Sequence, residues 1–468
     1  MSDFTIQNVI IPQTDGYTTT DVQIVDDKIT AIAPHLDIIG RLVNGENQLL
    51  LPGFVNAHTH SSEMWLRGLI PPFPLELWLA ELYAFPLLTP EQVYLSALGT
   101  AGETLLSGGT TVVDHLVLIP NQELDTVAAA VRGYKEIGIR AFIAPLIQDL
   151  PLSMGIPAAG TSQTHKPFFR STDETLEFMA TVIQQFHDPE SGIHIAVAPT
   201  GPQLCTDALF TGCMELSDKY NLCRHSHLLE TKVQQKLAQE RYGCSAVEYL
   251  QNLGYLSDRT SLAHCVWLSD KDITILAQTQ STVVHNPLSN LRLGSGIAPV
   301  LKYRQAGVNV AFACDGASSN DSQDLLEAIK IGSILHNVTD FDYRHWITPR
   351  QGVEMASIGG AKGLNMADEV GSLEVGKKAD LVMYNLKNLS LLPRTDPIGL
   401  LVLGRPGNVV SNAWVNGKQI VADGEIVTID VRELQQELFN QSQWSIKHQS
   451  QFTKDMEGHY RFVMDLPK

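Results

Sequence analysis

The chain contains, at positions 51–60, the stretch Leu51-Pro52-Gly53-Phe54-Val55-Asn56-Ala57-His58-Thr59-His60, an apolar run that ends in two histidines. Side chains two positions apart on a strand share a face, so these two imidazoles converge at the strand end. Two neutral imidazoles in that position can chelate a metal ion. The alternative is a pair of unrelated histidines, because short motifs also arise by chance.

Four later segments also end an apolar run in a polar side chain. They carry His227, His264, His285 and Asp315. In a parallel β/α barrel the loops at the carboxyl ends of the strands converge on one pocket, where such enzymes place their chemistry. The pattern therefore predicts a metal-dependent active site at that end of a barrel.

Apolar, β-branched runs recur often enough to build such a barrel, with room for a crossover helix between successive runs. They span residues 53–60, 109–116, 140–147, 193–200, 223–228, 260–265, 281–286 and 308–315. The first crossover has clear helix signals, with Thr89 as N-cap, Pro90 at the first helical position and Gln92 completing a capping box. We therefore predict an α/β fold, a (β/α)8 TIM-type barrel.

The two ends of the chain supply the structure beyond the barrel. Both read as short strands and turns, and neither has enough strands to close a core. We predict a small β-sandwich-like domain assembled from both ends. The expected divisions are 1–52 and 366–430 for the two parts of that domain, 53–365 for the barrel, and 431–468 for a C-terminal extension that begins as a helix and continues as an irregular tail.

Composition excludes several classes of protein. Hydrophobic residues make up 44% of the chain, yet no run of about 20 apolar residues exists to cross a bilayer. A net charge of −18 argues against a nucleic acid partner. The start of the chain lacks the features of a secretory signal, and the six cysteines form no Cys-x-x-Cys pair, so we expect a cytoplasmic protein with reduced thiols.

At this point the motifs resemble a known family. The stretch at 52–60, His227-Leu228-Leu229-Glu230, Ala263-His264-Cys265, His285-Asn286-Pro287-Leu288-Ser289-Asn290 and Asp315-Gly316-Ala317 are similar to those of the amidohydrolase superfamily. They look most like the branch that holds methylthioadenosine/S-adenosylhomocysteine deaminases, guanine-type deaminases and s-triazine hydrolases. The resemblance covers nearly the whole chain and is more specific for fold and metal chemistry than for substrate.

The resemblance implies that His58, His60, His227 and Asp315 bind one divalent metal. Such ligands suit zinc best, and iron or manganese would also accept them. Relatives with two metals use a carboxylated lysine at a strand end, and residues 140–147 and 193–200 contain no lysine. His225 shares a strand face with His227. Glu230 lies three residues beyond His227, which is the spacing that this branch shows between its metal ligand and its catalytic acid. We therefore assign His227 to the metal and expect His225 in a deeper layer of the barrel.

The resemblance also implies a hydrolytic deaminase that releases ammonia from an aminated heteroaromatic ring by attack of a metal-bound hydroxide. Asp315 would accept the proton of the water, and Glu230 would protonate a ring nitrogen. His264 would orient the hydroxide or hydrogen-bond the tetrahedral oxygen.

The substrate contacts are expected from Glu63, Trp65, Thr200, Gln203, His285 and Ser289. Two departures from the methylthioadenosine/S-adenosylhomocysteine pattern favour a purine, pyrimidine or triazine-type ring without ribose. Residues 82–88 lack the carboxylate expected to hold ribose hydroxyls, and Thr200 stands where a nucleoside-binding histidine is expected. A nucleoside is the second expectation.

Two alternatives come from other classes. A triazine hydrolase would expel chloride or an alkylamine by the same attack, although the presence of Glu230 favours deamination. A catalytically silent assembly barrel would not need the intact set of His58, His60, His227 and Asp315. A homo-oligomer is compatible with the sequence.

Overall fold

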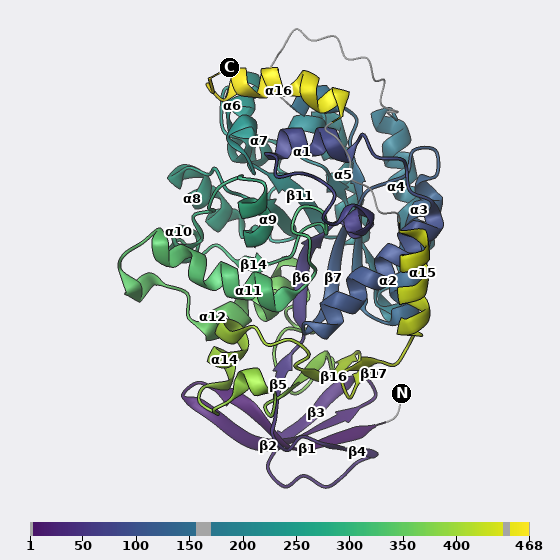
Figure 1. Cartoon of the computed structure of the whole chain (residues 1–468), viewed down its shortest axis with the longest axis vertical. Helices are drawn as coiled ribbons and strands as arrows, with labels where there is room; N and C mark the ends of the chain where they lie inside the picture. Colours follow the sequence, from purple (N-terminus) through teal and green to yellow (C-terminus); the bar gives the residue numbers. More distant parts are fainter. Residues whose placement is uncertain (1–2, 156–169, 443–449, 468) are drawn as a thin grey trace.

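All of the apolar runs expected in the barrel form strands (Figure 1). The computed structural model describes residues 3–155, 170–442 and 450–467. The strands are β6 (Phe54–Thr59), β7 (Gly109–Leu116), β8 (Arg140–Ile147), β9 (Ile193–Ile195), β10 (Ala198–Pro199), β11 (Arg224–Leu228), β12 (Thr260–His264), β13 (Thr282–His285) and β14 (Val310–Phe312). The run predicted as one strand over 193–200 is divided into the two short strands β9 and β10.

These strands form two parallel sheets. One has the order β10-β8-β7-β6, with β9 paired to β8, and the other has the order β11-β12-β13-β14. The backbone amide of His225 donates to the carbonyl of Val197 at 2.9 Å, and that of Asp315 donates to the carbonyl of His58 at 3.0 Å. The outer strands of the two sheets are therefore hydrogen-bonded to each other, and their carboxyl ends lie at the same end of the assembly.

Helices follow most of these strands. They are α1 (Leu75–Leu82), α2 (Pro90–Leu106), α3 (Glu123–Ile137), α4 (Thr172–Phe186), α5 (Asp207–Tyr220), α6 (Lys232–Tyr242), α7 (Ala246–Leu253), α8 (Asp270–Thr279), α9 (Pro287–Arg292), α10 (Val300–Gln305), α11 (Leu325–Ile334), α12 (Pro349–Glu354), α13 (Gly360–Gly363) and α14 (Pro397–Gly404). The predicted capping box of α2 is confirmed, since Thr89 accepts from the amide of Gln92 and Gln92 accepts from that of Thr89.

A nine-stranded sheet contains strands from both ends of the chain, as the sequence predicts. Its strands are β1 (Phe4–Gln13), β2 (Gly16–Val25), β3 (Lys28–Ala33), β4 (Arg41–Asn44), β5 (Gln48–Pro52), β15 (Leu381–Asn385), β16 (Val410–Val415), β17 (Lys418–Ala422) and β18 (Glu425–Ile426). Its order is β18-β17-β16-β15-β5-β1-β2-β3, with β4 beside β1. The antiparallel pair β5 and β15 joins the two ends.

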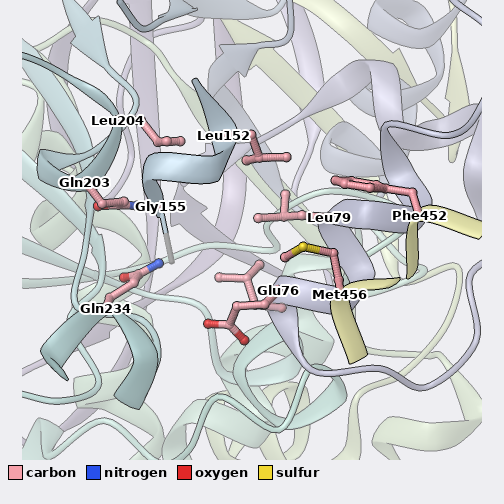
Figure 2. Close-up of a pocket in the computed structure, with 10 residues that line it drawn as sticks. Glu76, Leu79, Leu152, Gly155, Gln203, Leu204, Gln234, Phe452 and Met456 are labelled. Carbon is pink, nitrogen blue, oxygen red and sulfur yellow. The ribbon is translucent and has the colours of Figure 1, made fainter. Parts of the chain in front are cut away.

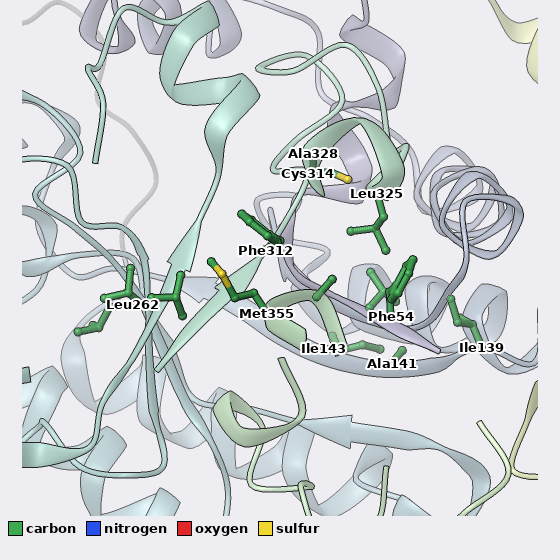
Figure 3. Packing of buried hydrophobic residues seen from close by; sticks show 14 of the residues in the cluster. Phe54, Ile139, Ala141, Ile143, Leu262, Phe312, Cys314, Leu325, Ala328 and Met355 are labelled. Atoms are coloured by element: carbon green, nitrogen blue, oxygen red, sulfur yellow. The ribbon is translucent and has the colours of Figure 1, made fainter. Parts of the chain in front are cut away.

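A buried ion pair connects this sheet to the parallel strands. Arg140, at the start of β8, donates to Asp380, just before β15, at 2.9 Å, and both side chains are almost fully buried. The large apolar cluster around it includes Phe54, Phe312 and Leu325, which are shown with their neighbours in Figure 3. Removing one member of such a buried pair costs about 3–5 kcal/mol, because the other charge is left without a partner. Loss of either member is therefore expected to weaken the contact between β8 and the segment before β15.

The C-terminal extension corrects one expectation. The helix expected after Val431 is present as α15 (Val431–Gln441), but a second helix, α16 (Gln451–Val463), replaces the predicted irregular tail. Ser450 caps α16, and Figure 1 shows the helix lying across α1, at the end of the molecule away from the nine-stranded sheet. No helix in the described part of the chain is both long and apolar enough to span a membrane.

Candidate active site

The side chains predicted to bind the metal meet at the carboxyl ends of the parallel strands. His58 lies on β6 and His227 on β11, while His60 directly follows β6 and Asp315 lies three residues after β14. His58 Nε2 lies 3.2 Å from Asp315 Oδ1, and His60 Nε2 lies 3.5 Å from the same oxygen. His227 Nε2 lies 3.3 Å from His60 Nε2. The structure thus groups His58 and His60 with Asp315 and places His227 next to His60, in a second group with His58 and His264.

These separations fit a tetrahedral metal ion. Bonds of about 2.0–2.1 Å to zinc place neighbouring ligand atoms of a tetrahedron about 3.4 Å apart. The three measured separations lie between 3.2 and 3.5 Å. These three separations are therefore compatible with a bound metal ion.

The other ring nitrogens of two ligands are fixed by backbone carbonyls. His60 Nδ1 lies 2.6 Å from the carbonyl oxygen of His115, and His227 Nδ1 lies 2.8 Å from that of Thr200. A carbonyl can only accept, so both Nδ1 atoms carry the proton in the neutral rings. Both Nε2 atoms then present lone pairs to the site, as metal ligands require.

His58 is oriented by a second histidine. His58 Nδ1 contacts His225 Nε2 at 2.8 Å, and His225 Nδ1 contacts Ser261 Oγ at 2.7 Å. His225 thus lies behind the ligands, in the layer that the sequence predicts. The opposite nitrogen, His58 Nε2, is buried and has no hydrogen-bond partner among the described residues. A buried nitrogen without a partner is costly, and a bound cation would satisfy it.

Two other groups of three histidines, both of which include His58, are also compact enough to hold a metal ion. One adds His227 and His264, and the other adds His115 and His225. Neither includes a carboxylate, whereas Asp315 supplies negative charge to the group with His58 and His60. Charge neutralisation in a buried site favours the group that contains Asp315.

Burial controls the charge of the ligands. Desolvation lowers the pKa of His58 and His227 well below the ordinary histidine value, which keeps both rings neutral. Burial opposes the ionisation of Asp315, but its close contact with His58 and the other nearby histidines hold its pKa well below the usual range. The neutral rings of His58 and His227 beside an ionised carboxylate suit metal binding. The pKa of His60 is raised instead, because the nearby charges of Glu63 and Asp315 outweigh burial.

Glu230 and His264 face each other beside this cluster. His264 Nε2 lies 3.6 Å from Glu230 Oε2 and 3.9 Å from Asp315 Oδ2, and its Nδ1 lies between the amides of Asn286 and Asn290. Ser295 Oγ donates to Glu230 Oε1 at 3.1 Å. Burial raises the pKa of Glu230, which favours its protonated form. Glu230 is therefore suited to donate a proton.

The backbone at these strand ends adopts unusual conformations. Leu229, His264 and Asp315 have φ angles of 46°, 72° and 63°, in the left-handed region that L-residues rarely occupy. Such residues cost free energy, and they cluster where a side chain must be aimed at a site. Their position at the ends of β11, β12 and β14 indicates that the fold is built to direct these groups inward.

Three of the predicted substrate contacts line the cavity next to the cluster. Glu63, Thr200 and Gln203 are in its wall, together with Trp78, Tyr83 and several leucines. The space within this wall is about 660 Å³, a volume that includes space open to solvent. Ser318 Oγ donates to Glu63 at 2.8 Å, and a Cβ on Gly316 would lie 1.8 Å from the Glu63 carboxylate, so glycine is required there.

The other three predicted substrate contacts do not belong to the cavity wall in the described part of the chain. The Trp65 indole donates to the Gln92 carbonyl at 3.0 Å, which turns it toward α2. His285 Nε2 lies 3.3 Å from His336 Nε2, and Ser289 is buried on α9. Tertiary contacts that cannot be predicted from the local sequence direct these side chains away from the cavity.

The sequence reasoning missed Glu76, Gln234 and the contribution of α16. Glu76 and Gln234 line the cavity system, and Phe452 and Met456 of α16 reach it from the far end of the chain (Figure 2). Glu76 is a carboxylate within an otherwise apolar helical run, and that was the available signal. Nothing local in residues 451–463 indicates that they lie over the site.

Comparisons with known proteins agree with this geometry. Residues 49–420 match the sequence profile of the Amidohydrolase family. The chain belongs to this family. A 5-methylthioadenosine/S-adenosylhomocysteine deaminase from Syntrophomonas wolfei is 34% identical over 425 residues, which cover 90% of this chain and 92% of the relative. A 5'-deoxyadenosine deaminase from Methanopyrus kandleri is 32% identical over 83% of this chain and 85% of the relative.

Solved structures of other amidohydrolases share the fold. An atrazine chlorohydrolase from Arthrobacter aurescens, complexed with zinc, superposes with a TM-score of 0.85 at 25% identity and covers 93% of this chain and 99% of its own. An adenosine deaminase from Xanthomonas campestris with bound zinc gives a TM-score of 0.83 at 27% identity. The match covers 93% of this chain and 97% of that structure's chain. Zinc in both neighbours agrees with the presence of a histidine-rich group in this chain.

Proposed function

We propose that this amidohydrolase is a metal-dependent hydrolytic deaminase that releases ammonia from an aminated heteroaromatic ring. The observation that carries the proposal is the spacing of His58, His60, His227 and Asp315 with Glu230 directly beside them. The relatives named as deaminases support it. The substrate is a small molecule that reaches the cavity beside Glu63 and Gln203.

We also propose that the two parallel sheets form one (β/α)8 barrel. The hydrogen bonds of His225 to Val197 and of Asp315 to His58 support this arrangement. In this division the barrel comprises 53–365, the nine-stranded sheet is a separate domain built from 1–52 and 366–430, and 431–468 is an extension that reaches the cavity.

His58, His60, His227 and Asp315 would hold one divalent metal, with zinc favoured over iron and manganese. Such a metal supplies Lewis acidity and lowers the pKa of a water molecule to about 7. A single metal is expected because no lysine lies on β8, β9 or β10 to bridge a second one.

The residues of the chain perform the proton transfers. Asp315 has a second oxygen, Oδ2, that faces His264 and can accept the proton of the attacking water. Glu230 protonates a ring nitrogen, so that the adjacent carbon becomes electrophilic and the negative charge leaves the ring. His264 donates through Nε2 to the oxygen that develops on that carbon. Asp315 then passes its proton to the amino group, and the hydroxyl proton of the tetrahedral centre returns to Glu230. Collapse of that centre expels ammonia and leaves a carbonyl group.

The choice of ring remains between two substrate classes. Thr200 in the cavity wall and the absence of a carboxylate over residues 82–88 favour a base or triazine without ribose. The relatives that act on nucleosides favour the second class. The alternative of a triazine hydrolase expelling chloride or alkylamine is suggested by the atrazine chlorohydrolase neighbour.

A screen for ammonia release tests the proposal. Aminopurines, aminopyrimidines, their nucleosides and amino-, alkylamino- and chloro-substituted triazines are incubated with the metal-loaded protein. Ammonia from at least one aminated ring is expected. Release of chloride or alkylamine without ammonia from any ring would favour the triazine hydrolase, and no reaction at all would favour an assembly role.

A further inference from the structure

A second compartment continues from the cavity beside the metal ligands. The two spaces share part of their walls, namely Leu75, Leu79, Leu152, Gln203, Leu204 and Gln234. The second compartment adds Glu76 from α1 and Phe452 and Met456 from α16 (Figure 2). A substrate whose ring lies at Glu230 can therefore extend into it.

One side of this compartment is polar. Glu76 is 6% exposed and Gln234 is 8% exposed, so both are buried within the wall. Thr231 Oγ1 donates to Glu76 Oε1 at 2.6 Å, and the Glu230 amide donates to Gln234 Oε1 at 2.8 Å. The carboxylate of Glu76 and the amide nitrogen of Gln234 lie on the same side of the compartment in Figure 2. Both groups are thus tied to the segment that carries the proposed acid.

Within the described ranges 3–155, 170–442 and 450–467, no cationic side chain pairs with Glu76 in this space. No lysine, arginine or histidine occurs among the described residues that line the compartment. Burial raises the pKa of Glu76 to about 7, and the nearby charge of Glu230 adds to that shift, although the hydrogen bond from Thr231 opposes it. A buried carboxyl with one neutral donor retains unused hydrogen-bonding capacity, which a ligand can satisfy.

The opposite side is apolar and comes from the end of the chain. Phe452 and Met456 of α16 face Leu79 and Leu152 across the compartment in Figure 2. The Ser450 amide donates to Glu81 of α1 at 2.7 Å, and the same carboxylate accepts from Thr453. These contacts fix the start of α16 on α1, so the apolar wall is a constant part of the site.

We propose that this compartment determines substrate specificity. It binds a substituent on the substrate, remote from the reacting ring, that presents a hydroxyl or amino donor to Glu76 and an apolar face to Phe452 and Met456. The inference rests on the proposed deaminase function, which places the reacting ring at Glu230. It predicts that a ring with a donor-bearing substituent, which need not be a ribose, is preferred over the same ring without one, because the bare ring fills the cavity only partly.

The test compares two substrates on the ring that the ammonia screen identifies, one bare and one carrying a hydroxylated substituent such as its nucleoside. Glu76→Gln keeps the size of the side chain and removes its charge. It should lower kcat/KM for the substituted substrate at least about tenfold, mainly through KM, because a hydrogen bond to a charged group is lost. The value for the bare base should stay within about twofold.

Two further variants complete the design. Glu240→Gln makes the same change on the exposed face of α6 and should leave both values unchanged. Met456→Ala should raise KM for the substituted substrate alone. The specificity proposal would be overturned if Glu76→Gln lowered kcat/KM equally for both substrates or left both values unchanged, even if deamination is observed.

Failure of the proposed function has a different signature. In that case no aminated ring releases ammonia, and calorimetric titration of adenosine and adenine replaces the kinetic comparison. Tighter binding of adenosine, weakened at least about tenfold by Glu76→Gln, would support the compartment on its own. Equal binding of the two ligands, or no binding, would overturn it.

Discussion

His60 and His227 direct their Nε2 atoms at each other across 3.3 Å, although 167 residues separate them in the chain. Each ring donates its Nδ1 proton to a backbone carbonyl, so two lone pairs face each other. Two lone pairs at this distance repel unless a cation lies between them. Asp315 Oδ1 lies 3.5 Å from the same nitrogen of His60, so a cation at this point would contact all three groups.

Metal content provides the first prediction. Protein purified without added metal should contain about one equivalent of divalent metal per chain, with zinc as the main element, because one set of four ligands is present. His227→Ala should lose most of that metal. Elemental analysis of both proteins measures this. A reproducible two equivalents, both needed for activity, would contradict the mononuclear site.

Glu230→Gln separates proton transfer from metal binding. The variant should retain its metal, because Glu230 faces His264 and is not one of the four ligands. Turnover should fall about 10²-fold or more, the usual effect of removing a general acid. Metal analysis and ammonia release on one preparation measure both effects. Loss of the metal would make Glu230 a ligand, and full activity would remove it from the mechanism.

The pKa of Glu76 predicts a pH dependence of stability. Its pKa is raised from 4.5 to about 7 in the folded protein, mainly by burial, so the folded state binds a proton that the unfolded chain releases. This contribution is fully present below the unfolded pKa and is lost as the pH rises through about 7. Its size is on the order of 3 kcal/mol.

Denaturation of the wild type and Glu76→Gln at several pH values measures this contribution. The glutamine variant does not titrate, so the stability of the wild type relative to it should decline between about pH 5 and pH 8. Glu240→Gln is the exposed control and should follow the wild type. Parallel curves for the wild type and Glu76→Gln would show that Glu76 titrates normally.

Substrate preference is open to a direct comparison. Methylthioadenosine and S-adenosylhomocysteine should be poor substrates, because residues 82–88 carry no carboxylate and Thr200 occupies the place expected for a histidine. Values of kcat/KM for both nucleosides are compared with those for other aminated rings. An efficiency of about 10⁴ M⁻¹s⁻¹ or above on either nucleoside would contradict this prediction. Glu76 would then be the first candidate for the missing hydroxyl contact.

The histidine-rich group could be predicted from the sequence because its signals are local and its placement follows from topology. His58 and His60 share a strand end, and the carboxyl ends of parallel strands meet whatever the intervening sequence. The family resemblance separated His227 from His225, and the structure places His225 behind His58. Strand period and strand direction together thus determine most of the metal site.

The wall of the substrate cavity could not be predicted in the same way. Glu81 contacts Ser450 across 369 positions of the chain, and this contact brings α16 over the cavity. His285 is turned toward His336 by packing that neither segment reveals. Contacts between residues so far apart in the sequence depend on how whole helices and strands pack against each other. The hydrophobic periodicity of one helix or strand does not indicate which other element it will contact.

The most direct test of hydrolytic deamination is the origin of the oxygen in the product. Metal-loaded protein is incubated in H₂¹⁸O with the most reactive aminated ring, and mass spectrometry follows the product while an ammonia assay runs in parallel. We predict one ¹⁸O atom in the new carbonyl group for each ammonia released, and neither with Glu230→Gln. An unlabelled product, or turnover without ammonia, would contradict hydrolytic deamination at this site.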